Sequence, residues 1–228
     1  MHSYRPLIPQ LLTVLFLLVV CKGTVEAVEQ RVSFSIPALG VVDQGGKLVG
    51  ATHYLVVQID RLPDLSGPQV QFNEGSRAFG NLKGAALSPD WKDAARMAVD
   101  AAARAIGEDP RSWLVTVKNV STAYITDGPS ASAVLAVGIV AALRGDTFPS
   151  NVAMTGRVEP DGRISDVGRI PEKLQGAAQS GLSVVLIPKG QLRTKDWDVR
   201  PLAESLRLTV LEVGTLSEAY EKITGRGF

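Results

Sequence analysis

The stretch that decides the fold covers residues 125–145 and reads ITDGPSASAVLAVGIVAALRG. The Asp-Gly-Pro sequence at residues 127–129 is typical of a tight turn, and Ser130 follows it directly. The residues after Ser130 are almost entirely apolar up to Arg144, and Gly145 marks the end, so they predict a helix buried on all sides. The sequence therefore places one hydroxyl group at the amino end of a buried helix, where free N–H groups and the helix dipole favour negative charge.

Two interpretations of Ser130 follow from this position. Serine is a common N-cap, because its side-chain oxygen accepts a hydrogen bond from one of the first amides of a helix. Alternatively, the helix end holds an oxyanion and Ser130 is a nucleophile. The second interpretation requires a neighbouring group that takes the hydroxyl proton, because an unassisted serine is a weak nucleophile.

Histidine and lysine are the candidate bases, and histidine is scarce. The sequence contains only His2 and His53, and His53 lies in a strand-like run where a half-exposed position is expected. A buried lysine is the alternative, because desolvation lowers a lysine pKa by up to about 3 to 5 units. Lys173 fits this requirement, since it lies in the first turn of an amphipathic helix predicted over residues 171–181, with apolar neighbours.

The remaining sequence alternates between strand and helix patterns and predicts a single α+β domain. A helix is predicted from Ser88, as N-cap, to Ile106, with Gly107 as the stop. A Pro-Asp-Gly turn at residues 160–162 predicts a hairpin. A closing helix is expected over residues 216–223. Strand patterns occur at residues 31–39, 41–42, 55–59, 113–120, 152–155, 183–190 and 208–214.

Residues 1–27 are predicted to be an export signal, and residues 28–228 the folded domain. His2 and Arg5 precede an apolar run over residues 11–21, and small residues precede a cleavage site after Ala27. A retained membrane anchor is the alternative. The expected location is therefore periplasmic or extracellular, or anchored to a membrane with the domain outside the cytoplasm.

Composition excludes several classes of site. The net charge is +1 and neither sign forms a long block, so no nucleic-acid partner is expected. Removal of the leader also removes Cys21, the only cysteine, and leaves one histidine, so no disulfide, metal site or cofactor is expected. The only Gly-Gly-Lys is followed by Leu48, so the sequence lacks a phosphate-binding G-x-x-x-x-G-K-[ST] loop.

Four segments together resemble the proteolytic domain of the Lon proteases. They are DGPSAS (127–132), NVAMTG (151–156), EKLQGAAQSGL (172–182) and VVLIPKG (184–190), and the resemblance extends over residues 31–224. It implies a Lon proteolytic-domain fold, with short mixed and antiparallel sheets packed against helices, and a serine-lysine dyad. Ser130 is the implied nucleophile and Lys173 the implied general base. Asp127, Gly128 and Thr155 are the implied supporting residues.

The chain departs from the family pattern at four positions near these motifs. Ser132 stands where the family usually has glycine, Thr116 and Lys118 where many members have histidines, and Arg157 where glutamate is usual. The serine and the lysine are unchanged by these departures.

The resemblance implies a serine endopeptidase. Because a leader is predicted and the phosphate-binding loop is absent, we expect this endopeptidase to be exported and to cleave unfolded or flexible polypeptides without ATP. It also implies a homo-oligomer, such as a ring of six subunits. Two alternatives stay open at this point. One is a non-catalytic peptide-binding or scaffold module of the same fold. The other is a protease subunit of a larger membrane complex with a separate ATPase.

Overall fold

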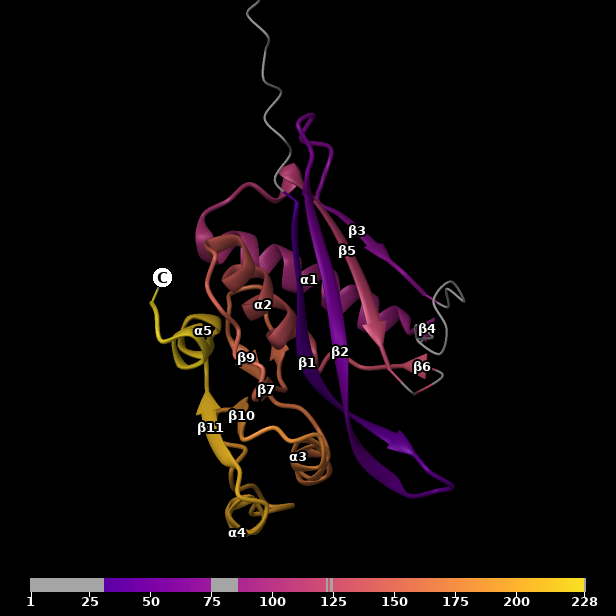
Figure 1. The fold of residues 1–228 in the computed structure, drawn as a ribbon, viewed down its shortest axis with the longest axis vertical. Helices are drawn as coiled ribbons and strands as arrows, with labels where there is room; N and C mark the ends of the chain where they lie inside the picture. The colour runs from indigo at the N-terminus through magenta and orange to yellow at the C-terminus, as the bar shows by residue number, and fades with distance from the viewer. Residues whose placement is uncertain (1–30, 75–85, 122, 124, 228) are drawn as a thin grey trace, which may run out of the picture.

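A mixed seven-stranded sheet, in the order β11-β10-β7-β1-β2-β5-β3, is the framework of the computed structural model (Figure 1). The structure describes residues 31–74, 86–121, 123 and 125–227. The predicted signal or anchor lies outside the described residues. Within the described ranges, no helix is both long enough and apolar enough to cross a membrane. The strands of the large sheet are β1 (Val32–Asp43), β2 (Leu48–Arg61), β3 (Gln69–Phe72), β5 (Trp113–Val120), β7 (Val152–Met154), β10 (Val184–Pro188) and β11 (Thr209–Val213).

β1 and β2 form a long antiparallel hairpin that extends beyond the rest of the sheet (Figure 1). The turn between them contains Gly45 and Gly46, both with positive φ, and the Gly46 N–H donates to the Asp43 carboxylate at 2.6 Å. Glycine adopts this backbone conformation without steric penalty. The strand patterns predicted at residues 31–39 and 41–42 belong to one continuous strand, because β1 pairs with β2 without interruption from Val32 to Asp43.

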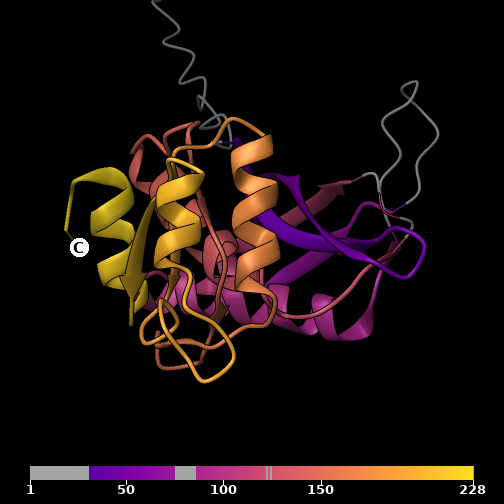
Figure 2. The same ribbon diagram turned by 90° about the horizontal axis from the view of Figure 1, so that it is seen from below.

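In the part of the chain that the structure describes, five α-helices pack on the two faces of the sheet (Figure 2). The side chains of β10 alternate between the two cores, with Leu186 in the core on the α1 and α2 side and Val185 and Ile187 in the core with α3. The helices are α1 (Pro89–Ile106), α2 (Ser132–Arg144) and α5 (Leu216–Thr224) on one face and α3 (Ile170–Gln179) and α4 (Arg200–Ser205) on the other.

Local signals predicted most of these elements correctly. Ser88 caps α1 by accepting the Trp91 N–H at 3.1 Å, and Gly107 ends the helix in the left-handed region. Strand β5 has the predicted bounds, and α2 is buried from Ser132 to Ala141 and ends at Gly145. The α+β class is confirmed, although most strands join one large sheet instead of several short ones.

Two small sheets complete the fold. β4 (Ala86–Leu87) pairs with β6 (Ile125–Thr126) in parallel, and β8 (Arg157–Val158) pairs with β9 (Ile164–Ser165) as the predicted hairpin. The sequence patterns missed β3 and α4. Both are short, with four residues in β3 and six in α4, and β3 pairs with β5 in parallel at the edge of the large sheet.

Candidate active site

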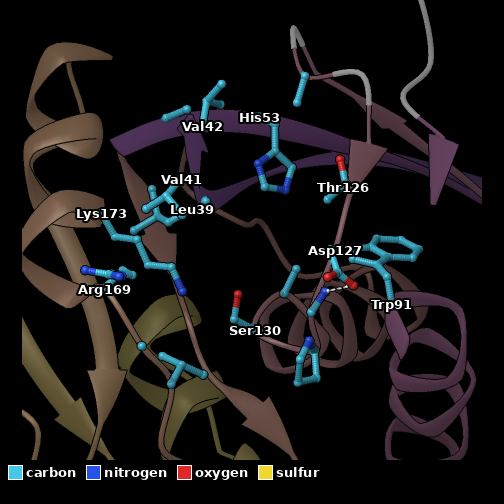
Figure 3. A pocket seen from close by; sticks show the side chains of 18 of the residues that line it. Leu39, Val41, Val42, His53, Trp91, Thr126, Asp127, Ser130, Arg169 and Lys173 are labelled. Carbon is cyan, nitrogen blue, oxygen red and sulfur yellow. Dashed lines mark hydrogen bonds between the residues drawn. The ribbon is translucent and has the colours of Figure 1, made fainter. Parts of the chain in front are cut away.

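Ser130 lies on the turn that precedes α2, with its hydroxyl exposed to a cavity (Figure 3). The N-cap of α2 is Ala131, and no side chain caps this helix, so the N-cap interpretation of Ser130 is wrong. The Ser130 hydroxyl has no hydrogen-bond partner among the described residues. The turn passes through Gly128 at φ 81°, and the Gly128 N–H donates to the Asp127 carboxylate at 2.7 Å.

Asp127 itself is exposed and connects this turn to the start of α1. Hydrogen bonds from the Ser88 hydroxyl and from the Gly128 amide lower its pKa. The backbone continues this connection, since the Ser88 N–H donates to the Thr126 carbonyl at 3.0 Å. Asp127 and Ser130 both line the cavity, but the Asp127 carboxylate is engaged in holding the turn whereas the Ser130 hydroxyl is free of hydrogen bonds to any described residue.

The segment that follows β7 holds the Ser130 turn from the other side. The Ser130 carbonyl accepts the Gly156 N–H at 2.8 Å and the Thr155 hydroxyl at 3.3 Å. Ser132 adds two bonds, because its hydroxyl donates to the Pro129 carbonyl at 2.8 Å and accepts the Val158 N–H at 3.0 Å. The backbone of the turn is therefore held by hydrogen bonds at Ser130 and at Ser132.

Lys173 points into the same cavity from α3 and is only 4% exposed. Its Nζ donates a hydrogen bond to Oγ1 of Thr155 at 2.9 Å. Burial lowers the pKa of Lys173 from 10.5 to about 8, and the neighbouring Glu172 carboxylate opposes this shift. A substantial fraction of Lys173 is therefore neutral near pH 8 and able to accept a proton.

Close backbone contact fixes α3, and with it Lys173, against strand β2. A Cβ atom added to Gly50 of β2 would lie 1.6 Å from the Glu172 carbonyl oxygen, and one added to Gly176 of α3 would lie 2.5 Å from the backbone of Gly50. The Thr52 hydroxyl donates to the Gly176 carbonyl at 3.3 Å. Only glycine at these two positions allows the helix to approach the strand so closely.

The backbone is strained just before α3. Arg169 is the N-cap residue and has φ 62°, a conformation that is costly for a residue with a Cβ atom. Arg169 also lines the cavity, and its carbonyl accepts the Lys173 N–H at 3.0 Å. The strained residue thus determines where the first turn of α3, with Lys173, begins.

The cavity that contains both side chains measures about 360 Å³ and falls within the range of ligand sites. In Figure 3, Lys173 and Ser130 point toward one another across its lower part, while His53 enters from β2 above. Its walls come from β1, β2, the loop before α3 and the turn before α2. No cluster of three or more His, Cys, Asp or Glu side chains suited to a metal occurs in the described ranges.

His53 differs from its prediction as a half-exposed strand residue. It is 7% exposed, because the face of β2 that carries it turns toward the cavity and the core. Burial, together with the charge of Lys173, lowers the pKa of His53 from 6.5 to about 4. The imidazole is therefore neutral at ordinary pH.

Comparison with known proteins identifies the family. A family model described as "Lon protease (S16) C-terminal proteolytic domain" matches residues 91–223, which is more than half of the chain. The chain belongs to the Lon protease family. Among Lon proteases, that of Neorickettsia sennetsu is 38% identical over 93 residues (41% of this chain and 11% of the relative). That of Methylocella silvestris is 33% identical over 156 residues (64% and 19%). The chain thus spans less than a fifth of the length of these relatives.

The four departures from the usual Lon pattern occupy different surroundings. Ser132 lies next to the turn that carries Ser130 and makes the two hydrogen bonds described above. Thr116 and Lys118 pair with Gln58 and Val56 on the sheet face opposite the cavity, and neither lines it. Arg157 is exposed on β8 and lies 3.4 Å from Glu159. Of the four, only Ser132 is positioned to affect the geometry around Ser130.

Proposed function

We propose that this Lon-family domain is a serine endopeptidase with Ser130 as nucleophile and Lys173 as general base. One observation carries the proposal: an unpaired serine hydroxyl and a buried lysine with a lowered pKa face the same cavity. Ser130 Oγ attacks the peptide carbonyl while Lys173 Nζ accepts the hydroxyl proton. Nζ then protonates the leaving amine as the C–N bond breaks, and a water molecule hydrolyses the acyl-enzyme with Lys173 again as base.

Backbone amides near the serine supply the oxyanion site in this mechanism. The N–H groups of Ser130 and Ala131 have no acceptor among the described residues, whereas those of Ser132 and Ala133 donate to the Pro129 and Gly156 carbonyls. Free amides beside a helix amino end stabilise the developing negative charge of a tetrahedral intermediate.

The proposed substrates are unfolded or flexible polypeptides, cleaved without ATP. The sequence contains no phosphate-binding loop that would couple ATP to substrate unfolding. We also propose that residues 1–27 direct export and that the active form is a homo-oligomer. Cleavage of unfolded casein should therefore be unchanged by ATP and magnesium, and analytical ultracentrifugation should show an assembly larger than a monomer.

Intact-mass measurement after treatment with a fluorophosphonate probe tests the nucleophile directly. The wild-type chain should gain the mass of one probe, and Ser130→Ala should gain none. Lys173→Arg should label far more slowly, because a guanidinium does not release its proton near neutral pH. Loss of casein cleavage in Ser130→Ala and Lys173→Arg would support the dyad, whereas full cleavage by either variant would contradict it.

The same experiment separates this function from the two alternatives. A non-catalytic peptide-binding module would bind unfolded chains without labelling or turnover. A protease subunit that depends on a separate ATPase would label but would cleave casein only when a nucleotide-binding partner is added.

A further inference from the structure

A buried imidazole faces the cavity with no hydrogen-bond partner. His53 is more than nine-tenths buried, and its Nε2 atom makes no hydrogen bond to any described residue. The ring projects from β2 into the cavity above Ser130 (Figure 3). Buried polar atoms in proteins are nearly always hydrogen-bonded, so an unpaired one beside a cavity is satisfied by a bound water molecule or by a ligand atom.

The residues that pack beside the ring are small. Gly40 of β1 lies against the imidazole, and a Cβ atom there would approach its Cε1 to 3.2 Å. Ala51, two residues before His53 on β2, also lines the cavity with a small side chain. Glycine at residue 40 therefore makes space for the ring itself, and Ala51 adds little bulk to the cavity wall beside it.

The electrostatics of the cavity favour an uncharged partner. Lys173 lies across the cavity and, with burial, holds the pKa of His53 at about 4, so the ring is neutral when the proposed base is active. A neutral imidazole offers one donor and one acceptor nitrogen. A hydroxyl or carboxamide group matches either nitrogen, whereas a lysine or arginine side chain would be repelled whenever Lys173 is charged.

We infer that His53 is a specificity residue that hydrogen-bonds a neutral polar side chain, such as threonine, serine or asparagine, next to the scissile bond of the substrate. This inference rests on the proposed peptidase function. It assigns no proton transfer to His53 and leaves the chemistry to Ser130 and Lys173.

Matched peptides that differ by one hydroxyl group test the inference. Blocked octapeptides of alanine and leucine would carry threonine or the isosteric valine on either side of the cleaved bond. At one of these two positions the full chain should prefer threonine by roughly 5- to 30-fold in kcat/KM, because valine leaves the buried nitrogen unpaired. His53→Phe should reduce this ratio to about one, and His53→Gln should retain part of it.

A control on the same strand separates recognition from packing. Tyr54 is adjacent to His53 but points to the opposite, exposed face, so Tyr54→Phe should keep the wild-type ratio. A purely structural role of His53 would lower kcat/KM for both peptides equally. If the ratio of kcat/KM for the threonine peptide to that for the valine peptide is the same in the wild type and in His53→Phe, the inference is overturned while the peptidase function stays intact.

A binding measurement covers the case in which the chain cleaves neither peptide, which would instead contradict the proposed function. The Ser130→Ala variant is labelled with ¹⁵N-histidine, and NMR records its imidazole nitrogens. The sequence contains only His2 and His53, so the resonances that disappear on the additional substitution His53→Gln belong to His53. The threonine peptide should shift the His53 Nε2 resonance, and the valine peptide should shift it much less. Identical shifts, or none with either peptide, would refute the inference.

Discussion

The Thr155 hydroxyl lies between Lys173 and the backbone of Ser130: it accepts a hydrogen bond from Nζ at 2.9 Å and donates one to the Ser130 carbonyl at 3.3 Å. One buried side chain thus fixes the direction of the proposed base and the position of the proposed nucleophile. The two residues it links are 43 positions apart in the sequence. Ala153 of β7 and Ile170 of α3 lie in the same core cluster, and this packing brings Thr155 next to Lys173.

Thr155→Val should weaken both ends of this link. Valine preserves the shape of the side chain but leaves the lysine amine buried without its acceptor, which costs about 1–3 kcal/mol of stability. We also expect kcat/KM for an unfolded substrate to fall by roughly 10-fold or more, because the hydrogen bond that directs the Lys173 amine is lost. Thr209→Val, at an exposed position of β11, is the matched control and should change neither quantity. Wild-type activity in Thr155→Val would contradict the linking role.

Activity should rise with pH between about 6 and 9. Lys173 must be neutral to accept a proton, and its pKa is lowered to about 8, so kcat/KM should reach half its maximum near that pH. His53, with a pKa of about 4, stays neutral over this range and adds no step. The profile is measured with a peptide that has no titrating side chain. A rate that falls from pH 6 to 9 would exclude Lys173 as the base.

Lys173→Met should abolish activity but stabilise the fold near pH 7. The pKa of Lys173 is lower in the folded state than its ordinary value of 10.5, so below pH 8 the fold must bury a cation. Stability should therefore rise with pH between about 8 and 10.5 in the wild type, where only the unfolded chain is protonated at this site. The methionine variant lacks this rise with pH, and its free energy of unfolding at pH 7 should exceed that of the wild type by up to about 3 kcal/mol. Urea unfolding at pH 7 and pH 10 measures both effects.

Gly50→Ala should displace α3 from strand β2. The new methyl group would overlap the Glu172 carbonyl oxygen, and such overpacking costs about 1–3 kcal/mol or more. Because Lys173 follows Glu172, proteolytic activity should fall by more than the loss of folded protein explains. Gly227→Ala has open space around its Cβ position and is the control. Thermal unfolding and kcat/KM at a temperature where both variants are folded distinguish the two effects.

Ser132→Ala should loosen the turn that carries Ser130. The substitution removes the bond to the Pro129 carbonyl and leaves the buried Val158 N–H without an acceptor, at a cost of about 1–3 kcal/mol. We expect slower fluorophosphonate labelling of Ser130 as well as a lower free energy of unfolding. Ser217→Ala, on the exposed side of α5, controls for loss of a helix serine. Labelling at the wild-type rate would show that the turn does not need Ser132.

Local chemistry determined much of this fold from the sequence alone. Ser88 and Gly107 delimit α1, the apolar run after the 127–129 turn predicts buried α2, and the Pro-Asp-Gly turn predicts the β8–β9 hairpin. Each of these signals acts within a few residues, through capping, periodicity or turn conformation. The motifs around Ser130 and Lys173 also predicted the family, while their catalytic roles stay a prediction.

Tertiary structure decided what depends on distant neighbours. β3 and α4 carry weak local signals and are held by pairing and packing with other elements. His53 has an alternating strand pattern around it, yet the cavity beside β2 buries it and leaves its Nε2 unpaired. The pKa of Lys173 is lowered because the packed structure, in which Gly50 and Gly176 let α3 lie against β2, buries the amine away from water. Desolvation is a property of the packed chain, so no sequence window contains it.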